Sequence, residues 1–413
     1  MGRALRRGAA VALAGGVAGC GGGDPPATTP TRASPGPAPV RLDPPFPLPR
    51  GLAVGLTEFD PGLIAGPATG SPALLGSARR LAALRPLFFR LPVLWRAAQP
   101  HADSPPDWEA PGIGGHSPRA QLRALAAARR RAGGGFEPLV TFYDTPAWAA
   151  DQGPGCAPPT PGISSRAPGT AALPAYRRLV RSLLELARAE GIPIRFWSAW
   201  NEPNSGLFLA PQRVACDPRA RSIGPSLYAP LVRALRAELD AAPGDQEVVV
   251  GDTSSPYAAR ARITQTAEFV RGLPPDVACA GRVWAHHQYV GDADRLAALR
   301  SALDARRCPG PALRIWITET GVGTRSSLTA RPTEPAILRA GCRALHAALG
   351  RWHRDPRVDV AIQYTFREDP NFPVGLAGPD LRLRYPAYAV WRAWGGRRGA
   401  ADPAPALPRA CRG

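Results

Sequence analysis

The sequence contains no lysine, so all 51 residues of the Lys and Arg class are arginines, against 32 acidic residues and a formal net charge of +19. These arginines are spread along expected helices, and no basic cluster interleaved with aromatic residues stands out. Nucleic-acid-binding proteins gather such charge on one face or within a recognisable module. We therefore expect no nucleic-acid partner and attribute the charge to a composition rich in Ala, Arg, Pro and Gly.

Several motifs are also missing. No GxGxxG or GxxxxGK[ST] turn follows an expected strand, which argues against a nucleotide-binding fold. No CxxC pair or Cys/His cluster is present, so we expect neither a metal site nor an organic cofactor. The chain is nevertheless long, at 413 residues with 45% hydrophobic content, and it can bury a large core.

The first 20 residues have the pattern of an export signal. Three arginines precede a small apolar run, residues 8–19, which is too short to span a bilayer. The run ends in Val17-Ala18-Gly19-Cys20, which resembles the lipoprotein box of bacteria, where the cysteine is lipidated. This predicts an exported protein held at a membrane surface through Cys20, or a plainly secreted one if Cys20 is incidental.

The rest of the chain divides by composition. Residues 21–48 are dominated by Pro, Gly, Thr, Ala and Ser and predict a disordered linker. Residues 49–396 carry the alternating apolar pattern of a single catalytic domain, and a Pro- and Arg-rich tail occupies 397–413. We expect the tail to lie along the surface, and we expect the protein to be a monomer.

Eight short apolar runs within this domain suit buried strands. They cover 51–59, 87–95, 136–144, 194–202, 246–254, 282–290, 313–321 and 358–366. Helical patterns follow them, most clearly at 117–133, 175–191, 224–242, 292–307 and 333–352, with Ser, Gly, Asp or Thr as plausible caps. Strands joined through helices are expected to be parallel, so the sequence predicts an α/β fold of the (β/α)8 TIM-barrel type, with an open doubly wound sheet as the alternative.

An even number of cysteines remains once Cys20 is set aside, which suggests disulfides in an exported protein. Six cysteines allow fifteen pairings. From the barrel architecture we expect the pairs Cys156–Cys216, Cys279–Cys308 and Cys342–Cys411.

Two glutamates stand at the ends of expected strands. The fourth strand ends in Asn201-Glu202-Pro203-Asn204 and the seventh in Thr318-Glu319-Thr320-Gly321. A barrel builds its active site at the carboxyl ends of its strands, so these two carboxyl groups can face each other across the mouth. Such a pair cleaves glycosidic bonds: one carboxylic acid protonates the departing oxygen, and the other carboxylate attacks the anomeric carbon. Like charges this close disfavour the ionisation of both groups at once.

These two motifs resemble the signature of the clan A retaining glycoside hydrolases, nearest their cellulase-like and family 39 β-xylosidase-like branches. The resemblance covers residues 50–396 and implies Glu202 as general acid/base, Glu319 as nucleophile and a carbohydrate substrate. It implies that Asn201 binds the sugar 2-hydroxyl. Further residues match segments of this family at other strand ends, namely Arg90 beneath the nucleophile, His287 and Tyr289 in a His-x-Tyr segment, and Trp148 in a Thr-Pro-x-Trp loop.

Strand eight departs from the family pattern. Many members carry a Trp there beneath the cleaved sugar, and this sequence offers Phe366 as the platform. Glu58 and Glu368 also follow strands, and we interpret them as rim residues. His286 is read as a barrel residue rather than a ligand of the sugar. The rival interpretation of the whole pattern is a catalytically silent barrel that binds carbohydrate or belongs to the cell envelope.

Overall fold

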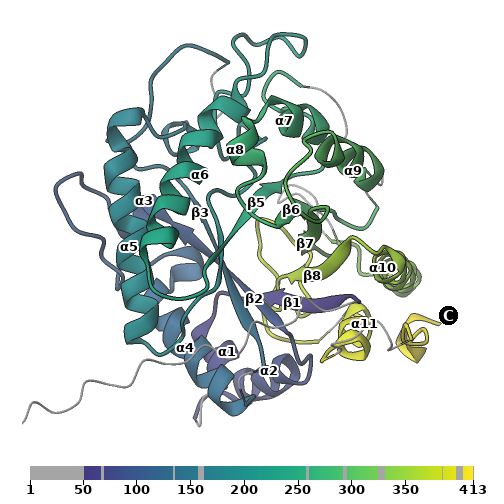
Figure 1. Ribbon diagram of the computed structural model, residues 1–413. Coiled ribbons are helices and arrows are strands. Elements are labelled where there is room, and N and C mark those ends of the chain that lie inside the picture. The colour runs from purple at the N-terminus through teal and green to yellow at the C-terminus, as the bar shows by residue number, and fades with distance from the viewer. Residues whose placement is uncertain are drawn as a thin grey trace, which may run out of the picture. The chain divides into compact units, whose positions relative to one another are not determined.

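Eight parallel strands close into a barrel in their sequence order, with β1 pairing with both β2 and β8 (Figure 1). The strands are β1 Ala53–Thr57, β2 Phe88–Leu94, β3 Glu137–Tyr143, β4 Phe196–Ser198, β5 Glu247–Thr253, β6 Val283–His287, β7 Arg314–Thr320 and β8 Val358–Tyr364. Each falls within one of the eight predicted runs. The (β/α)8 barrel is confirmed, and the doubly wound alternative is wrong because β8 closes onto β1.

The computed structural model describes residues 51–66, 69–133, 135–156, 162–256, 260–291, 295–323, 331–383, 385–396 and 403–412, all within one unit, Leu42–Gly413. The predicted signal at 1–20 with Cys20, the linker at 21–48 and the start of the tail lie outside these residues, so the expected export and lipid anchor stay predictions. No helix among the described residues is long and apolar enough to cross a membrane.

Helices cover the outside of the barrel (Figure 1). They are α1 Pro61–Ala65, α2 Pro72–Ala82, α3 Trp95–Ala98, α4 Pro118–Arg131, α5 Leu173–Ala189, α6 Gly224–Ala241, α7 Thr266–Gly272, α8 Pro275–Ala278, α9 Leu296–Asp304, α10 Pro335–Arg354 and α11 Ala387–Trp394. Four short 3-10 helices complete the described part: η1 Ile113–Gly115, η2 Ile163–Ser165, η3 Thr170–Ala172 and η4 Arg409–Cys411. All five predicted helices correspond to one of these.

Helix α5 illustrates how the pattern becomes structure. Its leucines at three- and four-residue spacing, including Leu179 and Leu183, are all buried. The helix ends at Ala189, and Gly191 follows with φ of 72°, the left-handed conformation that favours glycine. The sequence therefore specified both the buried face and the stop.

The expected helix caps are only partly correct. Ser117 accepts a hydrogen bond from the backbone N–H of Ala120 and caps α4 as predicted. Helix α10 instead begins after Glu334, whose side chain makes no capping bond, and not at the predicted Thr. Proline in the first turn of α10 explains the shift, because its fixed φ suits the first helical positions and it needs no acceptor for a backbone N–H.

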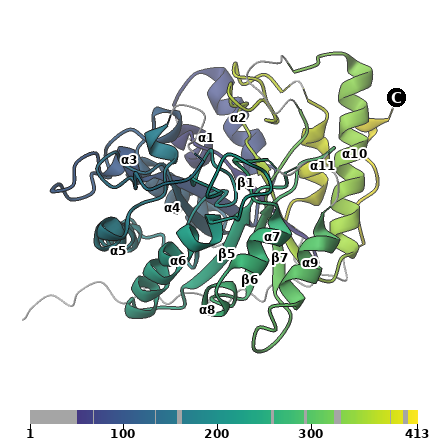
Figure 2. The ribbon, with the colours of Figure 1, turned by 90° about the horizontal axis from the view of Figure 1, so that it is seen from above.

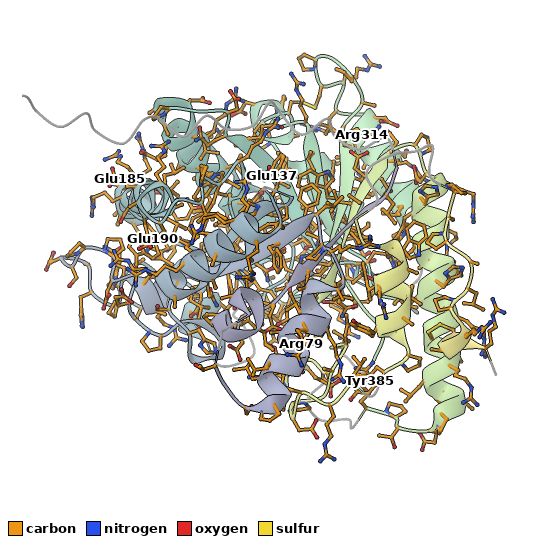
Figure 3. All side chains as sticks on the ribbon, turned by 90° about the horizontal axis from the view of Figure 1, so that it is seen from below. Arg79, Glu137, Glu185, Glu190, Arg314 and Tyr385 are labelled. Atoms are coloured by element: carbon orange, nitrogen blue, oxygen red, sulfur yellow. A yellow bond between two sulfur atoms is a disulfide. The ribbon has the colours of Figure 1, made fainter. Side chains whose placement is uncertain are left out.

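The hydrophobic core has two parts. Inside the barrel, one side chain or two from each strand, or from the residue just before it, fill the interior, with Phe88, Phe196 and Trp316 in mutual contact at ring-centroid distances of 4.7 to 6.1 Å. A larger cluster packs between the strands and the helices and includes Trp391 and Trp394 of α11. The strand starts face away from the mouth, and Glu137 and Arg314 mark the beginnings of β3 and β7 (Figure 3).

All three predicted disulfides are present: Cys156–Cys216, Cys279–Cys308 and Cys342–Cys411. The last joins the C-terminal tail to α10, and Arg343 of α10 donates a further hydrogen bond to the carbonyl oxygen of Cys411. Helices α10 and α11 lie side by side next to the chain end (Figure 2). The end of the tail is therefore attached to α10 through Cys411.

Candidate active site

Seven polar side chains from five strands, or from the residues that directly follow them, meet in one hydrogen-bonded cluster at the mouth of the barrel. We call it the catalytic cluster, and its members are Arg90, Asn201, Glu202, Asp252, His287, Tyr289 and Glu319. Six of the seven were predicted from the sequence. Asp252 was not.

The two predicted glutamates face each other. Glu202, His287 and Glu319 each offer one atom, and these three atoms lie within 4.8 Å of one another. Strand β4 ends at Ser198, earlier than the predicted boundary, so Glu202 lies on the loop that follows it. Glu202 and Glu319 remain 18% and 11% exposed at their side chains, so both carboxyl groups are accessible from the mouth.

Arg90 of β2 lies beneath Glu319. Its Nη1 donates to Glu319 Oε1 at 2.5 Å, and its Nη2 donates to Asn201 Oδ1 at 2.6 Å and to Asp252 Oδ2 at 2.8 Å. Burial alone would lower the pKa of Arg90, but the charges of Asp252 and Glu319 raise it above its ordinary value. Arg90 is therefore a fixed cation that holds three members of the cluster in place.

Tyr289 completes the support of Glu319. Its hydroxyl donates to Glu319 Oε2 at 2.7 Å. Burial, followed by the charge of Glu319, raises the pKa of Tyr289 well above 10, so the phenol keeps its proton and remains a donor. One oxygen of Glu319 thus accepts from a guanidinium and the other from a phenol, so both oxygens have a donor.

Asp252 is the member that the sequence analysis missed. It is fully buried and accepts hydrogen bonds from Arg90, from Thr141 at 2.9 Å and from Thr318 at 2.6 Å, while His287 Nε2 lies 3.1 Å away. Burial alone would raise the pKa of Asp252, but Arg90 and His287 lower it well below its ordinary value. Asp252 is therefore a buried anion between the two cationic side chains.

A bulge in β5 aims Asp252 into the mouth. The register between β5 and β6 shifts between Gly251 and Thr253, and Asp252 itself has φ of 58°. Gly251 has φ of 93°, and a Cβ there would meet the Trp284 ring at 2.5 Å, so only glycine fits. The signal in the sequence was an Asp directly after the apolar run of strand five, preceded by a glycine.

Three acidic residues at consecutive strand ends have a left-handed backbone. Glu202 has φ of 39°, Asp144 after β3 has φ of 70°, and Asp252 has φ of 58°. Such conformations are strained in residues other than glycine and gather at functional sites. The fold therefore holds these carboxyl groups in positions that an ordinary strand would not give them.

His287 joins the acid pair to Asp252. Its Nδ1 lies 2.8 Å from Glu202 Oε1 and 3.4 Å from Glu319 Oε2. Burial lowers the pKa of His287, but the charges of Glu319 and Asp252 and the hydrogen bonds to Asp252 and Glu202 outweigh it and raise the pKa to about 10. The ring is therefore an imidazolium that donates from both nitrogens, a more specific role than the predicted lining of the sugar site.

This pKa gives a prediction for stability against pH. The folded protein keeps the His287 proton up to pH of about 10, whereas the unfolded chain releases it near the ordinary value of 6.5. The stabilisation is therefore complete below pH 6.5 and is lost as the pH rises towards 10. We expect the difference in unfolding free energy between the wild type and His287→Gln, measured by urea denaturation, to shrink across that window.

Lysines, free cysteines and the neighbouring His286 do not contribute to the pH dependence of stability between pH 6.5 and 10. The sequence has no lysine, the six cysteines of the domain are paired, and burial lowers the pKa of the neighbouring His286 to about 3, so its effect falls below pH 6.5. The exposed His101→Gln is the matched control, and it should follow the wild-type curve. A constant gap between wild type and His287→Gln from pH 6.5 to 10 would show that His287 is neutral in the fold.

The predicted platform on strand eight is wrong. Phe366 has no exposed surface, because the chain beyond β8 turns it into the core against Tyr388. The half-buried aromatic residue at the end of β8 is Tyr364, the last residue of the strand. Its pKa is raised by burial and then by the charge of Glu319, which indicates that the two side chains lie near each other. The sequence analysis thus chose the wrong aromatic residue by two positions.

Other predicted residues lie around the catalytic cluster. Trp148 is half-buried, meets the Trp95 ring edge to face at 5.6 Å, and donates to the Gln99 carbonyl oxygen. These are the contacts of loop packing, and stacking on a sugar stays a prediction. His286 bonds to Thr253 within the barrel, as expected of a barrel residue.

A metal does not suit this donor set. Glu202, His287 and Glu319 have the spacing of metal ligands, but a metal bound there would have to displace the proton of His287 and would lie close to the cationic Arg90. Arg90 and His287 supply positive charge, and the two glutamates can exchange protons, so the cluster suits acid–base chemistry on a neutral substrate.

Comparison with solved structures finds proteins with a similar fold. The chain resembles a family 39 glycoside hydrolase from Bacteroides cellulosilyticus, with a TM-score of 0.51 and 16% identity over 84% of this chain and 64% of that one. It also resembles a GH5_18 protein from Bifidobacterium longum, with a TM-score of 0.52 and 14% identity over 86% and 80% of the two chains. An endo-β1,6-glucanase matches with a TM-score of 0.53 and 13% identity, over 83% of this chain and 74% of that one.

These likenesses establish the barrel fold and agree with the resemblance to clan A. The chain spans less than two thirds of the family 39 structure. A scan against protein-family models found no match, and a search of curated proteins found none.

Proposed function

We propose that this protein is a retaining glycoside hydrolase that cleaves O-glycosidic bonds of an oligo- or polysaccharide by double displacement. One observation carries the proposal: two carboxyl groups from opposite sides of the barrel mouth approach within 4.8 Å, and each has a different set of partners. Retaining enzymes hold their carboxyl groups about 5 to 5.5 Å apart, whereas inverting enzymes need about 6.5 to 9.5 Å to admit a water molecule.

The contacts of Glu319 suit the role of nucleophile. One of its carboxyl oxygens accepts from Arg90 and the other from Tyr289, so both oxygens are held in place by donors. In the first step one Glu319 oxygen attacks the anomeric carbon, the bond from that carbon to the leaving oxygen breaks, and a glycosyl ester forms.

The surroundings of Glu202 suit the role of general acid and base. With Arg90 and His287 positive and Asp252 and Glu319 negative, a protonated Glu202 leaves the cluster neutral, whereas an ionised one leaves a net negative charge. Burial favours the neutral arrangement. Glu202 then gives its proton to the leaving oxygen, and in the second step it takes a proton from the water that attacks the glycosyl ester. The sugar leaves with its original configuration.

Asn201 suits a contact with the sugar. Its carbonyl oxygen is occupied by Arg90, which fixes the orientation of the amide. No described residue accepts a hydrogen bond from its Nδ2, and the side chain borders the mouth. A donor fixed in this way can bind a sugar hydroxyl and strengthen as charge develops at the neighbouring carbon.

The experiment is a screen of chromogenic aryl glycosides, followed by NMR of the first product formed from any glycoside that is cleaved. We expect the anomeric configuration of the product to match that of the substrate before mutarotation. An inverted product would contradict the two-step mechanism. Binding of glycans without any turnover would instead support a silent carbohydrate-binding barrel.

A further inference from the structure

A cavity opens beside the ends of β1 and β8, on the same face of the barrel as the catalytic cluster. We call it the rim cavity; its walls are residues 58–60 after β1, Ile113, Gly114 and His116 around η1, 367–371 after β8, and Pro379. Its volume is about 410 Å³, within the roughly 300 to 1,000 Å³ that is usual for small-molecule sites. None of its walls belongs to the catalytic cluster, so it is a separate place on the rim.

A row of aromatic rings connects the rim cavity to Glu319. The row begins at Tyr289, whose hydroxyl bonds to Glu319, and continues through Phe372 at 5.1 Å between ring centroids. Tyr364 follows at 5.6 Å, and Phe59 in the cavity wall follows at 6.0 Å. Tyr364 and Phe372 are only half-buried, so part of each remains exposed along this path. Aromatic surface suits the apolar faces of pyranose rings.

Two polar side chains in the cavity are available for a ligand. His116 and Asn371 line it; the backbone N–H of Asn371 donates to Asp369, but neither of the two side chains has a hydrogen bond to a described residue. His116 is half-buried and Asn371 is exposed. An imidazole and an amide each offer both a donor and an acceptor, which matches the hydroxyl groups of a sugar.

The other polar groups in the wall are already used to hold its shape. Glu58 accepts from the backbone N–H groups of Phe59, Asp60 and Arg367, so it ties the loop after β1 to the loop after β8. Asp60 also pairs with the Arg367 guanidinium at 3.0 Å. The cavity therefore has a fixed frame.

A buried ion pair supports the frame from below. Glu368 accepts from Arg331 at 2.6 Å and from the hydroxyl of Tyr385, whose ring lies under the Arg331 guanidinium. Figure 3 labels Tyr385. Asn371 is thus held by a loop that is itself fixed, and His116 faces it from the turn around η1.

The charge of the wall favours a neutral ligand. Of its four carboxyl groups, Asp60 and Glu368 have arginine partners, while Glu58 and Asp369 have none among the described residues. Asp369 instead receives the Tyr364 hydroxyl at 3.0 Å. Burial raises the pKa of Glu58 to about 7, so the negative charge without an arginine partner lies mainly on Asp369. In a chain with a net charge of +19 this negative charge is local, and it disfavours a carboxylated sugar.

We propose that the rim cavity is a binding subsite for a neutral pyranose unit of the glycan, beyond the unit held at Glu319. This inference rests on the proposed function, and it identifies the substrate as an uncharged chain longer than a single glycoside. His116 and Asn371 bind hydroxyl groups of the distal unit, and the aromatic row guides the chain between the two places.

The test uses neutral oligosaccharides of two to five units, of the sugar and linkage that the aryl glycoside screen identifies, together with the aryl monoglycoside. We expect wild-type kcat/KM to rise with chain length. His116→Ala and Asn371→Ala should each lower kcat/KM for the longest substrate by about tenfold, the equivalent of one or two lost hydrogen bonds. Both should keep the aryl monoglycoside rate within about twofold of wild type. His101→Ala, on an exposed part of the loop after β2, is the matched control.

The outcomes separate this inference from the proposed function. Equal losses on long and short substrates, or no loss on either, would overturn the subsite while leaving the hydrolase intact. If the wild type turned over none of these substrates, that result would instead contradict the proposed function. A preference of the wild type for an oligouronide of the same length over the neutral chain would overturn the charge assignment.

Discussion

Glu319→Gln should lower kcat/KM by about a thousandfold or more and leave the fold intact. An amide cannot form the glycosyl ester, so the first step loses its nucleophile. Glutamine has the shape of glutamate and can still accept from Arg90, so the packing beneath it is preserved. The measurement is steady-state hydrolysis of the best aryl glycoside, with circular dichroism to confirm that the variant is folded.

The matched control for this variant is Glu185→Gln, the same chemical change at an exposed position of α5 (Figure 3). It should keep wild-type activity. If a folded Glu319→Gln retained more than about a tenth of wild-type activity, Glu319 would not be the nucleophile. An amide is too weak a nucleophile to account for such a rate.

Glu202→Ala should have an effect that depends on the leaving group. General acid catalysis contributes about 10² to 10⁴, so hydrolysis of a glycan, whose leaving alcohol needs a proton, should fall by that factor. A dinitrophenyl glycoside has a leaving group that needs no proton, and its first step should be nearly unaffected. The second step then limits the rate, because no base activates the water.

Azide separates this role from a structural one. It is a nucleophile that needs no base, so it should restore turnover of the dinitrophenyl glycoside by Glu202→Ala and give a glycosyl azide of retained configuration. It should not accelerate the wild type or Glu185→Ala. Equal losses on both leaving groups, with no response to azide, would remove Glu202 from the acid/base role.

Much of the architecture follows from periodicity. All eight strands were predicted because barrel strands are buried on both faces and read as continuous apolar runs. Glu202 and Glu319 followed from one rule, that the carboxyl ends of parallel strands share one face. Arg90, His287 and Tyr289 needed the family resemblance, since one arginine among 51 carries no signal of its own.

The misses have a physical cause in irregular backbone. Asp252 points into the mouth because of a bulge and a positive φ, and neither can be read from alternation. Phe366 was favoured because an extended strand was assumed to continue past Tyr364, whereas β8 ends there and the chain turns inward. The site thus departs from regular geometry at the same residues where the prediction failed.

The central claim is that the Glu319 carboxylate bonds to the anomeric carbon. It is tested most directly by trapping the ester with a 2-fluoro glycoside that carries a good leaving group, chosen from the sugar found in the screen, and by mass spectrometry of the digested protein. We predict one added sugar, on the peptide that contains Glu319, and none in Glu319→Gln. Time-dependent inactivation with the label on another residue would contradict the assignment.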